Sequence, residues 1–253
     1  MYAEERQAEI ATQARARGRV DVASLAEEFG VTTETVRRDL TALERAGVLR
    51  RVHGGAIPVE RLGFEPAVDT REGVAVNEKE AIAKAALNEL PVDGAIALDA
   101  GTTTLRLAEA IPADSELTVV TNSLPIATLL ATRPNLTVHM VGGKVRGRTL
   151  AAVGETSVAY LRDLYVDVAF IGANGFTLEH GFTTPNSTEA ATKKALIGCA
   201  GRSVVLADST KIGVNHFAAF AAPGDIDLLI TDHRVDVDAA AAIESAGLQV
   251  VRA

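Results

Sequence analysis

The chain has 253 residues, of which 47% are hydrophobic and 23% charged, so it is long enough to bury a core and too apolar to be mainly disordered. Its 25 Lys and Arg against 33 Asp and Glu give a net charge of −8, which excludes binding to nucleic acid or an anionic membrane through bulk charge and leaves only a local patch. One cysteine, no run of ~18 apolar residues and a polar first segment predict a cytoplasmic protein with no disulfide, membrane span or signal peptide.

Two helices joined by a tight turn are predicted near the start of the chain. The first covers 22–29 and ends at Gly30, and Thr32 or Thr33 caps the second. In the second helix, apolar residues at intervals of four and three define a buried stripe of Val36, Leu40 and Leu43. At about 100° per residue, polar side chains point away from this stripe or flank it: Glu34, Thr35, Arg37, Arg38, Thr41 and Arg45. Such a helix after a sharp turn is typical of a helix-turn-helix that reads DNA.

A basic hairpin is predicted directly after the second helix. Residues 49–56 read Leu-Arg-Arg-Val-His-Gly-Gly-Ala, which indicates a wing that contacts phosphates or the minor groove. Five arginines against three acidic residues give 33–55 a charge of +2, whereas 16 basic and 23 acidic residues give 61–253 a charge of −7. From the residues alone, two other interpretations stay open: a solvated helix with an ordinary Glu34–Arg38 pair, or a helix-turn-helix that docks protein.

Residues 22–40 resemble the N-terminal winged helix-turn-helix of DeoR-type bacterial repressors. The resemblance is carried by Thr-Val-Arg-Arg-Asp-Leu at 35–40 and by Arg-Val-His-Gly-Gly-Ala at 51–56. It implies that Arg37 and Arg38 contact operator DNA. The predicted DNA-binding residues are Thr33, Thr35, Arg37, Arg38, Arg50, Arg51 and His53.

A linker is predicted over 58–76, which contains Pro58, Gly63, Pro66 and Gly73. It separates a predicted DNA-binding domain over 1–57 from a second domain over 77–253. Seven short apolar runs follow, at 95–98, 117–120, 137–141, 166–171, 204–207, 228–230 and 248–251. Helical patterns lie between several of them, at 78–89, 105–110, 125–131, 188–199 and 237–246. This alternation predicts an α/β domain with a largely parallel sheet.

Polar loops follow five of the apolar runs, where α/β sheets bind ligands. The loop 99–104 precedes a helix, and its three threonines exceed what a plain capped turn needs, so we expect an anion site there. Basic loop residues can neutralise a phosphate, and Asp99 suits sugar hydroxyls. The predicted ligand-binding residues are Asp99, Gly101, Thr102, Thr103, Thr104, Thr121, Asn122, Ser123, Gly143, Lys144, Arg146, Asn174, Glu189 and Lys211.

From Asn77 to about Asp232 the chain resembles the sensor domain of DeoR-type repressors, which implies the ribose-5-phosphate isomerase fold and a sugar phosphate as inducer. An active isomerase is the alternative. Such isomerases carry Asp-Gly-Ala-Asp, then Lys-Gly-Gly, then a glutamate nine residues after the lysine. Here the segments read Ile-Gly-Ala-Asn at 171–174 and His-Gly-Phe at 180–182, with Glu189 in frame. Because the carboxylates needed for proton transfer and the lysine are missing, we expect binding without turnover.

The expected protein is a DNA-binding transcriptional repressor of sugar catabolism genes that a phosphorylated sugar releases from its operator. Fructose 1-phosphate is the first expectation, because 62–66 and the helix 77–87 resemble fructose-operon members of the family. Paired half-sites predict a homodimer or homotetramer. No cofactor is expected, the histidines lie too far apart for a metal site, Glu189 and Lys193 form a simple helix pair, and Cys199 is a core residue.

Overall fold

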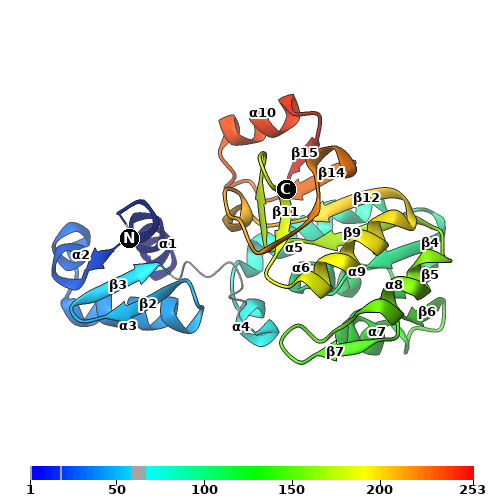
Figure 1. The fold of residues 1–253 in the computed structure, drawn as a ribbon, viewed down its shortest axis with the longest axis horizontal. Coiled ribbons are helices and arrows are strands. Elements are labelled where there is room, and N and C mark those ends of the chain that lie inside the picture. Colours follow the sequence, from blue (N-terminus) through cyan, green and yellow to red (C-terminus); the bar gives the residue numbers. More distant parts are fainter. Residues whose placement is uncertain (1, 18, 59–66) are drawn as a thin grey trace. The chain divides into compact units, whose positions relative to one another are not determined.

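The computed structural model describes residues 2–17, 19–58 and 67–253, and it divides into two compact units, Met1–Pro66 and Ala67–Ala253 (Figure 1). Residues 59–66 of the predicted linker over 58–76 lie outside the described residues, and helix α4 (Val68–Glu72) lies in the remainder. The Val68 amide donates a hydrogen bond of 2.9 Å to the Arg148 carbonyl, so the chain is held to the second unit from α4 onward.

Three helices pack around a small sheet in the first unit: α1 (Ala3–Arg17), α2 (Val22–Phe29), α3 (Thr33–Arg45), β1 (Val20–Asp21), β2 (Leu49–Val52) and β3 (Gly55–Pro58). The sheet is antiparallel with the order β1-β3-β2, so β3 is its central strand. A Cβ atom at Gly55 would overlap the Val20 carbonyl oxygen, which explains a glycine where β3 meets β1. All three helices and the hairpin share one apolar core, which includes Ile10, Leu25, Leu40 and Leu49.

The turn between α2 and α3 is built as the sequence predicts. Asp21 caps α2 by accepting hydrogen bonds from two amides of its first turn, and α2 ends at Gly30, whose φ of 62° is left-handed. Of the two candidate caps for α3, Thr32 takes the role: its Oγ1 accepts from the Thr35 amide at 3.2 Å. The predicted stripe of α3 is buried, with Val36 fully so.

The second unit is built on a seven-stranded parallel sheet in the order β15-β14-β12-β9-β4-β5-β6. Its strands are β4 (Asp93–Leu98), β5 (Glu116–Thr121), β6 (Leu136–Met140), β9 (Val166–Gly172), β12 (Ala200–Leu206), β14 (Leu228–Thr231) and β15 (Gln249–Arg252). Each of the seven apolar runs overlaps one of these strands. The predicted α/β class is therefore confirmed.

Helices cover both faces of this sheet (Figure 1). Successive strand residues point to opposite faces, so Ile96 and Phe170 enter one core while Ala97 and Ile171 enter the other. The first core is closed by α5 (Val76–Ala86), α6 (Thr102–Ala110) and α7 (Leu124–Leu130). The second is closed by α8 (Glu155–Arg162), α9 (Ser187–Gly198) and α10 (Val237–Ser245). Single turns of 3₁₀ helix occur at η1 (Leu87–Glu89), η2 (Ser209–Lys211) and η3 (Pro223–Asp225).

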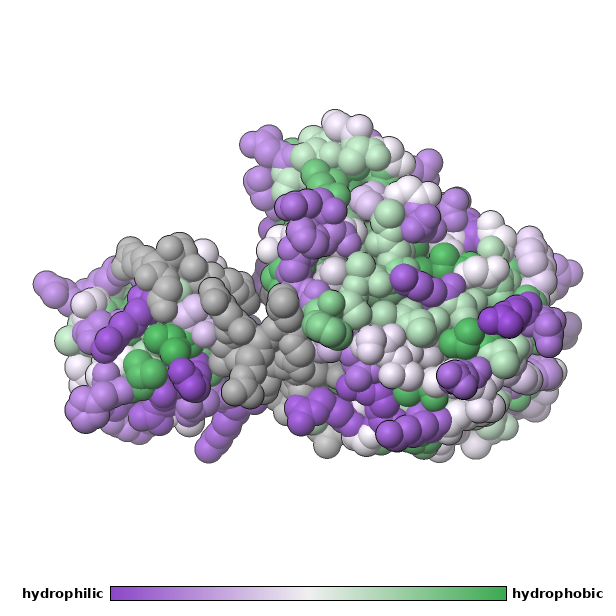
Figure 2. Space-filling model, viewed as in Figure 1, coloured by the Kyte–Doolittle hydropathy of each residue, from purple (hydrophilic) through white to green (hydrophobic). Residues whose placement is uncertain are grey.

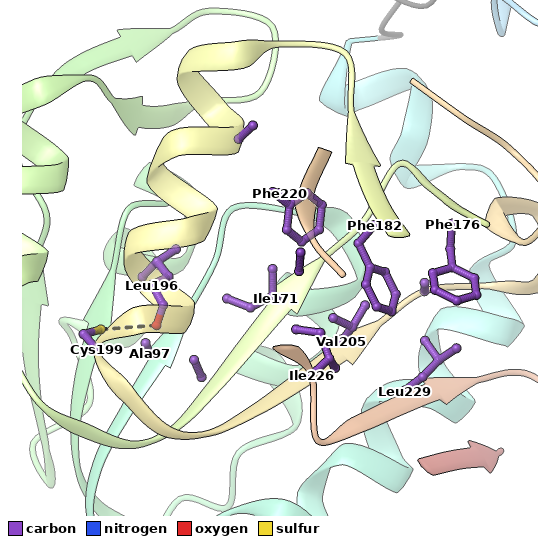
Figure 3. Packing of buried hydrophobic residues seen from close by; sticks show 14 of the residues in the cluster. Ala97, Ile171, Phe176, Phe182, Leu196, Cys199, Val205, Phe220, Ile226 and Leu229 are labelled. Carbon is purple, nitrogen blue, oxygen red and sulfur yellow. Dashed lines mark hydrogen bonds between the residues drawn. The ribbon is translucent and has the colours of Figure 1, made fainter. Parts of the chain in front are cut away.

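An antiparallel sheet that the sequence did not predict packs beside the second core. Its order is β10-β11-β13, from β10 (Gly175–Thr177), β11 (Gly181–Thr184) and β13 (Ala218–Ala221). Each strand contributes one phenylalanine, and Figure 3 shows these three rings side by side: the Phe182 centroid lies 4.5 Å from Phe176 and 6.1 Å from Phe220. Cys199 is a buried core residue, as predicted, and burial raises the pKa of its thiol.

A hairpin replaces the polar loop predicted after β6. Lys144–Arg146 form strand β7, which pairs with β8 (Ala151–Val153). The chain enters this hairpin at Gly143, where φ is +147° and a Cβ atom would overlap Ser157 Oγ, so only glycine fits the turn. None of the described helices is long and apolar enough to cross a membrane. Figure 2 shows polar and apolar residues interspersed on the visible face of each unit.

Candidate functional site

The outer face of α3 exposes its arginines. The side chains of Arg38 and Arg37 are 82% and 58% exposed, and each lies near Glu34, at 3.9 and 3.8 Å. Surface ion pairs of this kind contribute little, so both guanidinium groups are available to a partner. Thr33 is exposed and Thr35 is half-buried. The predicted DNA-binding residues of α3 therefore lie on or beside its solvent-facing side.

The acidic residue next to these arginines is turned inward. Asp39 is buried, and its Oδ2 pairs with Arg6 Nε at 2.6 Å while its Oδ1 accepts from Gln7 Nε2 at 2.9 Å. This contact joins α1 to α3, and Arg6 neutralises the charge of the Asp39 carboxylate. The local charge of +2 predicted for 33–55 includes the negative charge of Asp39, whereas in the structure Arg6 of α1 neutralises that charge away from the exposed arginines.

The predicted wing is the hairpin of β2 and β3. Its candidate DNA-binding residues, Arg50, Arg51 and His53, are all exposed. The Arg51 amide donates to Glu44 Oε1 at 2.9 Å, and its guanidinium donates to Thr41 Oγ1 at 3.2 Å. Because Thr41 and Glu44 belong to α3, the wing is tied directly to that helix.

In the second unit, the strand order reverses between β4 and β9. Along the chain, β5 and β6 are added on one side of β4, while β9, β12, β14 and β15 are added on the other. Open α/β sheets bind ligands at the carboxyl ends of the strands where this reversal occurs. Asp99 follows β4, Gly172 ends β9 and Asp208 follows β12, so these residues lie at the carboxyl ends of three neighbouring strands.

Asp99 is the centre of a buried polar cluster at this reversal. Its Oδ2 accepts from the Gly172 amide at 3.1 Å and forms an ion pair with Lys193 Nζ, which also donates to the Gly172 carbonyl at 2.8 Å. Asp99 Oδ1 is buried without a hydrogen-bond partner among the described residues. Sequence analysis paired Lys193 with Glu189 and so missed this contact, which joins residues 94 apart in the chain.

Glu189 forms a second buried ion pair, with Arg146. Arg146 was expected to neutralise a phosphate, and in the structure it joins the β7–β8 hairpin to α9. Since Glu189 and Lys193 lie one turn apart on α9, the two ion pairs lie along one face of that helix.

Three predicted ligand residues after β5 shape the loops around Asp99. Thr121 Oγ1 donates to the Leu98 carbonyl at 2.6 Å, Asn122 Oδ1 accepts from the Ala100 amide at 3.0 Å, and Ser123 caps α7. All three side chains are buried. Thr121 and Asn122 connect the loop after β5 to the end of β4 and the loop that follows it. These side chains therefore have a structural role.

The first turn of α6 adjoins this cluster. Gly101 precedes the helix as its N-cap and gives it no side-chain cap, and Thr104 Oγ1 donates to the Asp99 carbonyl at 2.6 Å. Thr102 and Thr103 are buried in the same turn. First-turn amides have no acceptor within their own helix, so this turn suits an anion.

Two lysines from different elements lie near Asp208, Lys211 from η2 and Lys79 from α5. Lys211 Nζ lies 3.7 Å from Asp208 Oδ2. Burial lowers the pKa of Lys79 to about 8; Asp208 opposes this shift, whereas Lys211, Arg71 and Arg106 add to it. Burial raises the pKa of Asp208, but Lys211 and other neighbours outweigh it, so the net pKa lies below its ordinary value. These effects place Lys79 and Lys211 near Asp208, and Arg71 and Arg106 near Lys79.

Lys79 and Arg71 join this candidate site, although the sequence alone did not predict them. Lys79 Nζ donates to the carbonyls of Arg71 and Val74 at 2.5 and 2.6 Å, and Arg71 Nε is buried without a hydrogen-bond partner among the described residues. The signal was present in the periodicity: Lys79 precedes buried Ile82 and Ala83 by three and four positions, which places a lysine on the buried face of α5.

The remaining predicted ligand residues are more dispersed. Lys144 is exposed on β7, and no hydrogen bond or ion pair within the described ranges joins it to the Asp99 cluster. The Asn174 amide donates to the Thr183 carbonyl at 3.2 Å, which ties its loop to β11. A shallow hollow between α6 and α7 is lined mainly by apolar residues and one carboxylate, so it does not suit a phosphate. Among the described residues, no group of three His, Cys, Asp or Glu could hold a metal.

Two family models match the chain. The DeoR-like helix-turn-helix domain matches residues 6–61, and the DeoR C terminal sensor domain matches residues 74–233. The second match alone covers more than half of the chain.

Curated relatives match nearly the whole chain. The HTH-type transcriptional regulator GlpR of Haloferax volcanii is 40% identical over 91% of this chain and 90% of its own length. The uncharacterized HTH-type transcriptional regulator FruR of Bacillus subtilis is 37% identical over 84% and 85%, and the lactose phosphotransferase system repressor of Streptococcus mutans is 35% identical over 93% and 94%. Ribose 5-phosphate isomerase A from Neisseria gonorrhoeae shows a TM-score of 0.40 at 17% identity, over 54% of this chain and 53% of that one.

Proposed function

We propose that this chain, which belongs to the DeoR family of DNA-binding transcriptional regulators, is a repressor of sugar catabolism genes that a phosphorylated sugar releases from its operator. In this proposal α3 and the wing bind operator DNA through the seven residues predicted from the sequence. The carboxyl edge of the sheet in the second unit binds the sugar phosphate.

The observation that carries the proposal is a group of cations beside buried Asp208: Lys211 Nζ lies 3.7 Å from its Oδ2, and Lys79, whose charge also acts on Asp208, donates from Nζ to the Arg71 carbonyl. Lys211, Lys79 and Arg71 come from η2, α5 and α4, and the pKa of Lys79 responds to the other two. Like charges near one another are destabilising unless an anion joins them, and a phosphate brings close to two negative charges at neutral pH. The first turn of α6 adds backbone donors beside the same edge.

The sugar end is assigned to the Asp99 side of the site. A carboxylate repels a phosphate and accepts hydrogen bonds from hydroxyl groups, so Asp99 belongs with the sugar; Asn174, in the loop after β9, is assigned there too. Fructose 1-phosphate is the first candidate. It rests on a sequence resemblance over 77–87 and over 62–66, and the latter segment lies outside the described residues.

The decisive experiment titrates phosphorylated sugars into a complex of the full chain with its own upstream DNA. We expect fructose 1-phosphate, or another member of a panel of ketose and aldose phosphates, to release the protein, while the unphosphorylated sugars do not. Tighter DNA binding on adding the sugar phosphate would make it a corepressor. No response to any member of the panel would reject the proposed ligand class.

Isomerisation is not part of the proposed function. The relatives in hand are named as transcriptional regulators, and Ile171 and Asn174 stand where the isomerases carry aspartates. Glu189, the one retained carboxylate, is engaged by Arg146. A coupled assay with ribose 5-phosphate and fructose phosphates should show no turnover; turnover that Glu189→Gln abolishes would overturn this view. The proposed assembly is a homodimer or homotetramer, and light scattering with and without operator tests it.

A further inference from the structure

The buried pair of Asp99 and Lys193 leaves one hydrogen-bond acceptor unused within the described part of the chain. Asp99 Oδ2 is fully engaged, by the Gly172 amide and the Lys193 ammonium. Its second oxygen, Oδ1, is equally buried and has no partner among the described residues. A buried carboxylate oxygen without a hydrogen bond is destabilising, and native proteins retain such groups mainly where a water, ion or ligand completes them.

Lys193 is held in one position by three different groups. Its Nζ contacts Asp99 Oδ2, donates to the Gly172 carbonyl at 2.8 Å, and lies 5.4 Å from the centroid of the Phe220 ring. Asp99 and Gly172 flank the strand-order reversal, and Phe220 belongs to the small antiparallel sheet. The ammonium is therefore committed to protein groups, and it fixes the carboxylate against β9.

We propose that Asp99 Oδ1 accepts a hydrogen bond from a hydroxyl group of the bound sugar, and that Lys193 is the positioning residue that holds this acceptor in place. The inference rests on the proposed function and names the part of the ligand that the site reads. A hydroxyl fits because it donates a proton, carries no charge to repel the carboxylate, and forms a charge-assisted hydrogen bond with it.

This arrangement predicts that the site selects ligands by a sugar hydroxyl group and not only by the phosphate. A site built to bond a substrate hydroxyl strongly rejects an analogue that lacks it, because the buried acceptor is then left unpaired. Inorganic phosphate, which has no sugar hydroxyl, uses only the cations beside Asp208. The two kinds of ligand therefore report separately on the two parts of the site.

The test compares the full wild-type chain with the double variant Asp99→Asn/Lys193→Met. Both replacements have nearly the original size and remove the two charges together, so neither partner is left as an uncompensated buried ion. The control is Glu89→Gln/Arg202→Gln, which removes a half-exposed ion pair between η1 and β12. Calorimetry measures the binding of inorganic phosphate, fructose 1-phosphate, fructose 6-phosphate, ribose 5-phosphate and tagatose 6-phosphate to each protein.

We expect the double variant to bind the sugar phosphate that wild type prefers at least roughly tenfold more weakly. Its affinity for inorganic phosphate should change less than about twofold. Lys193→Arg, which keeps the charge, should recover part of the loss. Equal binding of that sugar phosphate to wild type and double variant would overturn the inference alone, and would assign a water molecule to Oδ1. Equal weakening of both ligand kinds would make the pair merely structural and also overturn it. If no sugar phosphate binds wild type, the proposed function fails as well.

Discussion

The two units place their charged residues in opposite ways. On α3 and the wing, arginines face solvent, and a neighbouring carboxylate, Asp39, is buried against Arg6. At the sheet edge of the second unit, Asp99, Lys193, Glu189 and Lys79 are all buried. The contrast shows how partner size determines a site. A long rigid polyanion is bound by cations that reach outward, whereas a small molecule must be enclosed by polar groups whose mutual contacts hold them in position.

The largest expected effect is the loss of operator binding in Arg37→Ala/Arg38→Ala. A side chain that reads a base edge contributes about 1–3 kcal/mol, so losing two such contacts weakens binding by roughly a hundredfold or more. Gel shifts on the chain's own upstream DNA measure it. The control Lys84→Ala/Arg162→Ala removes two exposed cations from the second unit. Unchanged DNA binding in Arg37→Ala/Arg38→Ala would show that the exposed arginines of α3 do not bind the operator, which would contradict the first half of the comparison.

A second prediction concerns the buried carboxylate of the first unit. Asp39→Asn leaves Arg6 without its charged partner, and breaking a buried ion pair from one side destabilises by about 3–5 kcal/mol. Urea titration followed by hydrogen exchange should show the first unit opening at lower urea, with the second unit unchanged. Glu34→Gln, an exposed acid on the same helix, serves as the control. A loss below about 1 kcal/mol would show that the Arg6–Asp39 pair is dispensable.

The third prediction separates the units functionally. Lys211→Met removes a cation at Asp208, so the sugar phosphate should no longer release the operator complex, and the coupling of typically about 5–150-fold is lost. DNA binding without sugar should stay at the wild-type level, because α3 lies in the other unit. Lys84→Met, an exposed lysine on α5, is the matched control. If Lys211→Met is released from the operator at the same sugar phosphate concentrations as wild type, Lys211 is not part of the sugar phosphate site.

The smallest expected effect is a pH dependence confined to the second unit. Lys79 has a pKa of about 8, below the ordinary 10.5, so it loses its proton as pH rises through about 8. A bound phosphate favours the charged lysine, and sugar phosphate affinity should therefore fall up to roughly tenfold between about pH 7 and about pH 9. Arginines stay charged over this range, so operator affinity should change less. Lys79→Gln should flatten the sugar phosphate profile; a slope that persists would assign it to another group.

Periodic features of the sequence were sufficient for the framework. The stripe of Val36, Leu40 and Leu43 determined the face of α3, and seven apolar runs marked seven strands because parallel strands are buried on both faces. The sequence places the candidate site at the strand ends, and it predicts only some of the polar residues that the structure brings together there. Lys193 and Arg6 act through partners 94 and 33 residues away, and no local spacing encodes such contacts. The short strands β10, β11 and β13 are too brief, and too rich in glycine and small residues, to show a pattern.

The central position of β3 has an entropic consequence. Since β1 and β2 both pair with β3, and Arg51 is bonded to Thr41 and Glu44, the wing backbone is already ordered in the free protein. In the proposed DNA complex, binding fixes side-chain rotamers of the wing but little of its main chain, so the conformational entropy lost on binding is limited to about 0.5–1.5 kcal/mol for each immobilised side chain. The wing is thus preorganised: most of its ordering takes place when the first unit folds, before any DNA arrives.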